Sequence, residues 1–257
     1  MKPEIVQLFI EDALDNYVYI LHEPQQNVTF AIDPTRAEPV QQALENKGWK
    51  LDYVLNTHHH WDHTDGNIGL QKATGCKVIG YQDDAHRIPG IDIQVQDKQT
   101  LQLGNLSAEI MFVPGHTTGH IAYYFADQAM VFPGDTLFCM GCGRMFEGTE
   151  EMMWHSLCKL NALPDKTAMY CAHEYTVANG AFALSVEPHN HNTQKRLEEA
   201  KDARSKGLST VPASIGEEKL TNPFLRVESN EIRTTLGMEN ASDAQIFGAL
   251  RERKDSF

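Results

Sequence analysis

Residues 58–63 read His-His-His-Trp-Asp-His, so four of six consecutive residues are histidines. The apolar segment 51–56 leads directly into this run. Imidazole and carboxylate are the ligands that hold zinc and its first-row neighbours in proteins. A purification tag is terminal and uniform, whereas this run is internal and interrupted by Trp61 and Asp62. The alternative is a loop of solvated histidines, but the pattern favours a metal site at the end of a strand.

The spacing of the run indicates ligands for two different ions. Side chains of an extended chain alternate between its two sides, so His58 and His60 are expected on one side and His59 on the other. A helix is expected to begin just beyond the tryptophan, which places Asp62 and His63 in its first turn. The first pair would then face one ion and the second pair another.

Three further ligand candidates stand downstream, and each follows a short apolar run of strand character: His116, Asp135 and His173. They are needed because a zinc ion takes at least three protein ligands, and four residues cannot complete two sites. Each one alone is more consistent with an ordinary buried histidine or a turn aspartate. Their common position after strands favours loops held on one rigid scaffold, as in α/β enzymes. Two neighbouring metals predict a hydrolase.

Several motifs together carry a family resemblance. HxHxDH at 58–63, Gly-His at 115–116, Gly-Asp at 134–135 and the histidine at 173 resemble the metallo-β-lactamase superfamily. That superfamily also includes RNA-processing nucleases, lactonases and persulfide dioxygenases. CGR-F-EGT at 142–149, HEYT at 173–176 and NPFLR at 222–226 narrow the resemblance to glyoxalase II, the hydroxyacylglutathione hydrolase family.

The resemblance implies an α/β fold, an αββα sandwich followed by a small helical carboxyl-terminal domain. We therefore expect a metal domain at 1–173 and an α-helical glutathione-binding domain at 174–257. Residue patterns predict these elements independently. Strands are expected at 5–9, 17–21, 28–32, 51–56, 77–81, 100–103, 108–113, 121–125 and 129–132, and helices at 38–47, from 62 to about 75, and at 150–163, 177–186, 193–206 and 241–254, with an irregular connection at 208–226.

The resemblance also implies roles for the ligand candidates. His58, His60 and His116 would bind the first metal, Asp62, His63 and His173 the second, and Asp135 would bridge both. The expected cofactors are two divalent ions per chain, most readily zinc, with iron or manganese as alternatives because His/Asp sites accept all three. Asp62 and Asp135 are the catalytic candidates, and a metal-bridging hydroxide would attack the thioester.

The implied substrate is an S-(2-hydroxyacyl)glutathione, typically S-D-lactoylglutathione. Its hydrolysis to glutathione and D-lactate is the second step of methylglyoxal detoxification. Arg251 and Lys254 lie three residues apart on one helix face and would clamp a glutathione carboxylate. The alternative is a solvated helix end, where the helix dipole favours cations. The full set of implied substrate residues is Arg144, Phe146, His173, Tyr175, Arg251 and Lys254; Phe146 stands where the family often has tyrosine.

Composition limits the possible partners. The net charge of −13 disfavours a polyanionic nucleic acid as a partner. The acidic amino-terminal stretch has no long apolar core, so neither a signal peptide nor a membrane span is expected. Five cysteines, an odd number, suit a reducing compartment, and we expect a cytoplasmic monomer. Cys139-x-x-Cys142 lacks the second pair of a zinc ribbon and is expected to serve packing.

Two other classes of function compete with this interpretation. Another enzyme of the superfamily, such as a lactonase or a persulfide dioxygenase, would keep the metal residues but would not need Tyr175, Arg251 and Lys254 together. A non-catalytic metal-binding or redox module would keep only part of the ligand set. The complete set of seven ligand candidates argues against the module.

Overall fold

The computed structural model describes residues 2–257. The chain divides into two compact units. The first unit contains the chain up to Phe112 together with Gly119–Gly134, and the second contains Val113–Thr118 and Asp135–Phe257. The domain boundary expected after residue 173 stays a prediction.

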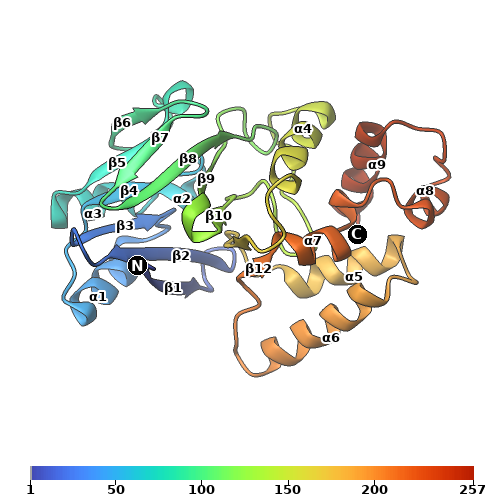
Figure 1. Ribbon diagram of the computed structural model, residues 1–257, viewed down its shortest axis with the longest axis horizontal. Helices are drawn as coiled ribbons and strands as arrows, with labels where there is room; N and C mark the ends of the chain where they lie inside the picture. The colour runs from blue at the N-terminus through green and yellow to red at the C-terminus, as the bar shows by residue number, and fades with distance from the viewer. Residues whose placement is uncertain (1) are drawn as a thin grey trace. The chain divides into compact units, whose positions relative to one another are not determined.

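The first unit begins with a mixed six-stranded sheet in the order β1-β2-β3-β4-β5-β6 (Figure 1). Strands β1, β2 and β3 pair antiparallel, and β3 to β6 pair parallel. Successive parallel strands need a long crossover connection. Helix α1 therefore links β3 to β4, and α3 lies in the link between β4 and β5. The bounds are β1 Glu4–Ile10, β2 Asn16–Glu23, β3 Val28–Ile32, α1 Ala37–Lys47, β4 Tyr53–Leu55, α2 Trp61–Thr64, α3 Asn67–Thr74, β5 Lys77–Tyr81 and β6 Ile91–Val95.

Both faces of strand β2 are buried, and alternate residues serve different cores. Val18 and Ile20 join a cluster that includes Val40 and Leu44 of α1 and Leu70 of α3. One face of the sheet is therefore covered by these two helices.

The opposite face of the first sheet packs on a second, antiparallel sheet. Within the first unit its strands are β7 Thr100–Leu103, β8 Leu106–Phe112, β9 Ile121–Phe125 and β10 Met130–Phe132. Tyr19 of β2 meets Phe132 with ring centroids 5.4 Å apart, and Phe30 of β3 stacks on Phe125 at 5.9 Å. These aromatic pairs fill the space between two stacked sheets, and the expected α/β sandwich is confirmed.

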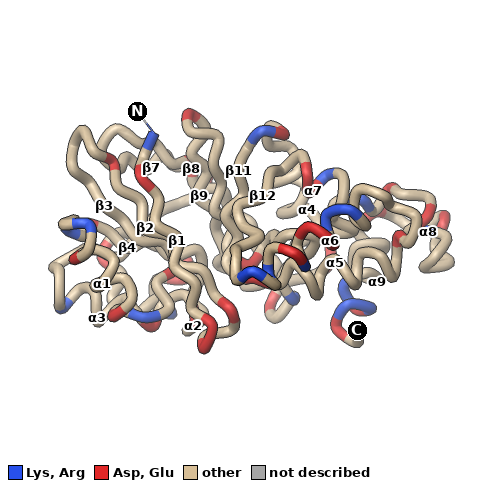
Figure 2. Tube along the Cα trace, turned by 90° about the horizontal axis from the view of Figure 1, so that it is seen from below, with Lys and Arg blue, Asp and Glu red and all other residues tan. Residues whose placement is uncertain are grey.

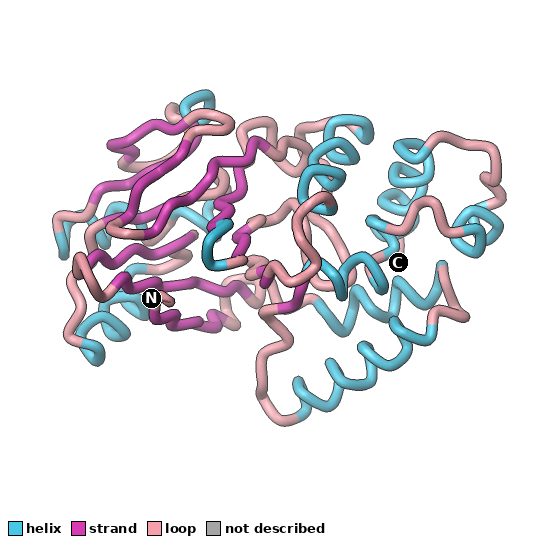
Figure 3. The backbone as a smooth tube through the Cα atoms, in the orientation of Figure 1, coloured by secondary structure: helices cyan, strands magenta, loops and turns pink. Residues whose placement is uncertain are grey.

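The second unit is largely helical, and cyan helices dominate the last third of the chain in Figure 3. Its core contains Phe224, which stacks on Phe182 at 5.8 Å and meets Phe247 at 5.9 Å. Figure 2 shows basic and acidic positions following one another along α6, which fits its largely exposed surface. The bounds are α4 Glu150–Asn161, β11 Ala168–Met169, α5 Thr176–Val186, α6 His191–Ser205, β12 Ala213–Ser214, α7 Ile215–Thr221, α8 Asn230–Leu236 and α9 Asp243–Asp255.

Most expected elements are present, with β5, β7 and β9 at the expected bounds. The helix expected from residue 62 to Gly75 is split into α2 and α3, and it ends where Gly75 adopts a left-handed conformation. Strands β6 and β12 and helices α7 and α8 were not expected. The connection 208–226 is therefore not wholly irregular, because it contains β12 and α7. Within residues 2–257, no helix is long and apolar enough to cross a membrane.

Candidate metal centre

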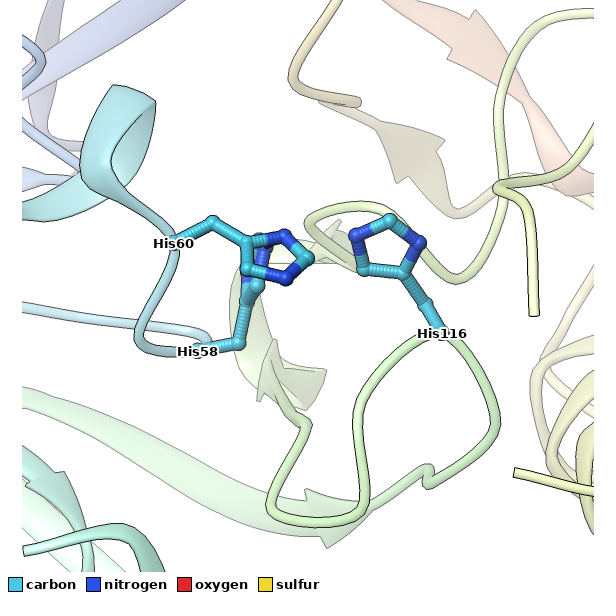
Figure 4. Close-up of side chains that lie close together, drawn as sticks. All are labelled: His58, His60 and His116. Atoms are coloured by element: carbon cyan, nitrogen blue, oxygen red, sulfur yellow. Dashed lines mark hydrogen bonds between the residues drawn. The ribbon is translucent and has the colours of Figure 1, made fainter. Parts of the chain in front are cut away.

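The first unit contributes four ligand candidates from the chain that follows β4. His58 Nε2 lies 3.0 Å from His60 Nδ1, and Figure 4 shows the two side chains on the same side of their loop. His59 turns to Asp84, with 3.1 Å between Nδ1 and the carboxylate, as the alternation predicts. In α2, His63 Nε2 lies 3.3 Å from Asp62 Oδ2. His58, Asp62 and His63 are buried, and these side chains are therefore held in a fixed arrangement.

One buried carboxylate, Asp33, fixes the proton on two of these rings. Asp33 Oδ2 accepts a hydrogen bond from Thr57 Oγ1 at 2.6 Å and lies 3.0 Å from His63 Nδ1. Because a carboxylate only accepts, His63 carries its proton on Nδ1. The hydroxyl proton of Thr57 is donated to Asp33. The Thr57 oxygen therefore accepts a hydrogen bond from His58 Nδ1 at 3.1 Å. Both rings keep a lone pair on Nε2, which is the arrangement a metal requires.

Two asparagines hold the backbone of α2. Asn16 Nδ2 donates to the Asp62 carbonyl at 2.7 Å, and Asn56 Nδ2 donates to the His63 carbonyl at 2.8 Å. Both asparagine side chains are buried. They anchor the short helix that presents the second pair of ligand candidates.

His120 stacks on His58 with ring centroids 4.6 Å apart, so it supports the ligand loop. Gly134 lies beside both His120 and Thr57, and it has a φ of +51°. A Cβ atom at residue 134 would lie 2.8 Å from the His120 ring and closer still to Thr57. The Gly-Asp motif therefore requires glycine for both conformation and space.

The second unit contributes His116, Asp135 and His173, all buried. His116 projects from the loop after β8 (Figure 4). Its Nε2 lies 3.4 Å from Asp135 Oδ2, and His173 Nε2 lies 3.2 Å from Asp135 Oδ1. Each carboxylate oxygen thus faces a different imidazole. A carboxylate in this arrangement is suited to bridging two cations.

The loop at Gly143 and Arg144 organises these ligand candidates through its backbone. His116 Nδ1 donates to the Arg144 carbonyl at 2.7 Å, which leaves Nε2 of His116 with its lone pair. The Gly143 amide donates to the Asp135 carbonyl at 3.0 Å. A Cβ atom at residue 143 would collide with the Asp135 carbonyl oxygen, so only glycine allows this approach.

Two aromatic substrate candidates lie against ligand candidates within the second unit. The Tyr175 ring stacks in parallel on His173, with centroids 4.9 Å apart. Phe146 meets His116 edge-on at 5.2 Å and is 63% exposed. An exposed aromatic ring beside a buried polar group offers an apolar surface to an organic substrate.

The three candidate cations differ in exposure. The Arg144 side chain is 60% exposed, whereas that of Arg251 is 4% exposed. Lys254 is half-buried and donates from Nζ to the Ala178 carbonyl at 3.3 Å. Burial and the neighbouring Arg251 cation lower the pKa of Lys254 below its usual value.

The cysteines show no sign of an activated nucleophile. Burial raises the pKa of the Cys142 thiol to about 11. A hydrogen bond with Cys171 and burial raise the pKa of Cys139 well above its usual value, and the two sulfur atoms lie 4.0 Å apart. All five cysteines are free thiols, and the interpretation of Cys139 and Cys142 as packing residues agrees with their burial.

The supporting roles of four residues were not predicted from the sequence: Asp33, Thr57, Asn16 and Asn56. Asp33 directly follows the apolar strand β3, so the rule that located the other strand-end residues would have included it. The asparagines carry no comparable signal, because their role depends on contacts 46 and 7 residues away in the chain. The donor set fits divalent metals of the zinc class: imidazole nitrogens with fixed lone pairs, and buried carboxylates.

The similarity of the chain to known proteins agrees with this set of metal-ligand candidates. The model of the metallo-beta-lactamase superfamily matches residues 19–173, and that of the hydroxyacylglutathione hydrolase C-terminus matches residues 174–257. A hydroxyacylglutathione hydrolase of Methylococcus capsulatus is 51% identical over 99% of this chain and 98% of its own length. One from Maricaulis maris is 46% identical over 95% of both chains. The crystal structure of ETHE1 from Myxococcus xanthus covers 98% of this chain and 99% of its own, with a TM-score of 0.68 and 26% identity.

Proposed function

The chain belongs to the hydroxyacylglutathione hydrolases of the metallo-β-lactamase superfamily, and from that membership we propose how its residues hydrolyse a glutathione thioester. It is a thioester hydrolase of the glyoxalase II type. We assign S-D-lactoylglutathione as the typical substrate, with glutathione and D-lactate as products.

The proposed centre holds two divalent metals. His58, His60 and His116 would bind the first, Asp62, His63 and His173 the second, and Asp135 would bind both. Zinc is the proposed metal, with iron or manganese as alternatives. Two such ions supply Lewis acidity that activates water near neutral pH and polarises the thioester carbonyl.

The observation that supports this proposal is the orientation of the imidazoles. In His63 and His116 the Nδ1 proton is held by a carboxylate or a carbonyl, and in His58 by a threonine that Asp33 fixes. These contacts preorganise the Nε2 atoms before any ion arrives. Asp62 and Asp135 supply the negative charge that balances the metals and are the proposed catalytic carboxylates.

The leaving group of the reaction needs little assistance from protein side chains. A glutathione thiolate has a pKa near that of cysteine, about 8.5, so it leaves without a dedicated proton donor. Cys139 and Cys142 are not needed as nucleophiles, since a hydrogen bond with Cys171 and burial raise the pKa of Cys139, and burial raises the pKa of Cys142.

The peptide part of the substrate carries two carboxylates and requires cations in an otherwise acidic chain. We propose that Arg251 and Lys254 of α9 provide the positive field for the glycine carboxylate and that Arg144 and Tyr175 meet the peptide. Phe146 and His173 would complete the surface near the acyl group. Phe146 lacks the hydroxyl of the tyrosine common in the family, so one hydrogen bond to glutathione would be absent.

Three broader expectations remain proposals. Residues 1–173 would form the metal domain and residues 174–257 the glutathione-binding domain, and the ranges of the two matched families support that division. The enzyme would be a cytoplasmic monomer that acts on a small molecule, without nucleic acid or membrane partners. Size-exclusion chromatography with light scattering would test the monomer directly.

Hydrolysis of S-D-lactoylglutathione by the purified protein tests the function. Thiol release should depend on bound metal, and it should exceed the release from a small acyl thioester that lacks the peptide. Metal-loaded protein that releases no thiol from S-D-lactoylglutathione would refute the proposal.

A further inference from the structure

Asp255 stands at the last residue of α9 and pairs with two arginines of the second unit. Its Oδ1 atom lies 3.0 Å from Arg251 Nη2 and 3.2 Å from Arg144 Nε. One oxygen therefore forms ion pairs with both guanidinium groups, and it accepts a hydrogen bond from Arg251 Nη2. No role for this residue could be read from the sequence.

The two arginines differ in how firmly they are held. Arg251 is 4% exposed, donates from Nη1 to the Cys142 carbonyl at 2.8 Å, and lies over the Phe224 ring at 5.2 Å. Arg144 is 60% exposed, and within residues 2–257 its side chain has no other ion pair. Arg251 thus anchors Asp255 from the buried side, and Asp255 in turn holds the exposed arginine.

The geometry of the contact leaves Arg144 able to bind an anion. The ion pair places Asp255 beside Nε of Arg144, so the terminal Nη1 and Nη2 edge remains for a second carboxylate. An unrestrained arginine would lose much side-chain entropy on binding, and a held one loses less. The last turns of α9 and the loop of Arg144 carry four cations and two anions: Arg144, Arg251, Arg253 and Lys254, and Glu252 and Asp255. Their sum stays positive.

We propose that Asp255 is a positioning residue that orients Arg144 for the peptide part of a glutathione thioester. This inference rests on the proposed function and deepens it, because it assigns the preorganisation of the cation site to a carboxylate. Asp255 does not touch the substrate. It acts through Arg144, and its effect therefore requires that arginine.

A double-mutant cycle tests this dependence. Asp255→Asn, Arg144→Ala and the double variant are compared with wild type, using KM and kcat for S-D-lactoylglutathione and the inhibition constant of glutathione. Asp255→Asn should raise KM about fivefold, the scale of one partly exposed charged contact, with kcat unchanged. In the Arg144→Ala background, the same substitution should change KM by less than about twofold.

Two controls separate positioning from general structure. Glu252→Gln removes a different, exposed carboxylate of α9 and should leave KM unchanged. Asp255→Glu keeps the charge and should recover part of the lost affinity. Thermal stability and metal content of each variant, measured alongside, detect a collapse of the helix end.

The outcomes are distinct. If wild type hydrolyses S-D-lactoylglutathione but the two substitutions act additively on KM, the positioning role of Asp255 is wrong. An Asp255→Asn variant with reduced kcat and unchanged KM contradicts it equally. If wild type neither hydrolyses this thioester nor binds glutathione, the proposed function fails instead.

Discussion

At the scale of single residues, polar side chains behind the ligand candidates determine how the imidazole rings are oriented. Asp33 accepts a hydrogen bond from His63 directly, and it acts on His58 through Thr57. One carboxylate therefore orients two rings that are proposed to bind different metals. Loss of such a supporting partner typically weakens metal affinity by 10- to 100-fold. Residue type and spacing predict the ligand candidates, but they do not predict the side chains that form hydrogen bonds with them.

Asp33→Asn should therefore weaken metal retention. An amide can donate a hydrogen bond, so the side chain no longer forces the protons of Thr57 and His63 into their places. We expect metal affinity about 10-fold lower or worse, measured by competition with a chelator. Asp65→Asn, which removes an exposed carboxylate beside α2, is the control and should retain metal like wild type. Equal retention by both variants would remove Asp33 from the account.

The cysteines should be dispensable for chemistry. Cys139→Ala, Cys142→Ala and Cys171→Ala should each keep kcat within about tenfold, or about 1.4 kcal/mol of barrier. Mass spectrometry of enzyme quenched during turnover should detect no acyl group on any cysteine. An acylated cysteine would contradict a direct attack by water.

At the scale of elements, periodicity and turn chemistry predicted most strands and the long helices. Several short elements were not predicted. Helix α7 has only seven residues, but its capping box of Ser214 and Glu217 was readable in the sequence. Strand β6 alternates Ile91, Ile93 and Val95 and was equally readable. In contrast, the break between α2 and α3 depends on a backbone contact from Gly66 to Pro34, which no local pattern contains.

Glu187, the residue after α5, should stabilise the helical unit in a pH-dependent way. Its buried carboxylate binds Arg226 through 2.8 and 2.7 Å contacts. Burial raises its pKa, but hydrogen bonds from Arg226, Ser229 and Asn190 outweigh that effect and hold the pKa below the usual 4.5. A lowered folded-state pKa contributes stability above the unfolded value, and the contribution is lost as the pH falls through the folded value.

Glu187→Gln should accordingly lower the free energy of unfolding by about 3 kcal/mol at pH 7, and the difference from wild type should shrink below pH 4.5. Urea unfolding at several pH values measures both. Glu199→Gln, in an exposed pair on α6, should cost less than about 0.5 kcal/mol at any pH. A loss at Glu187 that does not vary with pH would mean that packing, not charge, is responsible.

Lys254 in α9 should make substrate affinity fall at alkaline pH. Burial and Arg251 lower its pKa from the usual 10.5, so its charge is lost earlier than that of an ordinary lysine as the pH rises. KM for S-D-lactoylglutathione should then begin to rise below pH 10.5. Lys254→Arg keeps its charge throughout and should show a flatter profile. Parallel profiles for the two proteins would exclude Lys254 from carboxylate binding.

At the scale of the whole molecule, the family, the sandwich and the helical carboxyl-terminal segment could be predicted because their motifs are contiguous. HxHxDH and NPFLR each occupy a few successive residues. Asn16 could not be placed in the same way, since its role arises from a contact with Asp62, 46 residues away, whereas Asp33 lies at a strand end like the other candidates. Contacts group Val113–Thr118 and Asp135 onward with the carboxyl-terminal helices, and the domain boundary expected after residue 173 stays a prediction.

Metal titration of the apoprotein tests the central claim most directly. Bound zinc and the rate of S-D-lactoylglutathione hydrolysis are measured against zinc added, for wild type and for Asp135→Ala. The account predicts that wild-type activity saturates at two metals per chain and that Asp135→Ala loses affinity at both positions, since the proposed bridge contacts both. Full wild-type activity with one tightly bound metal, or loss of only one metal in Asp135→Ala, would contradict the bridged dinuclear centre.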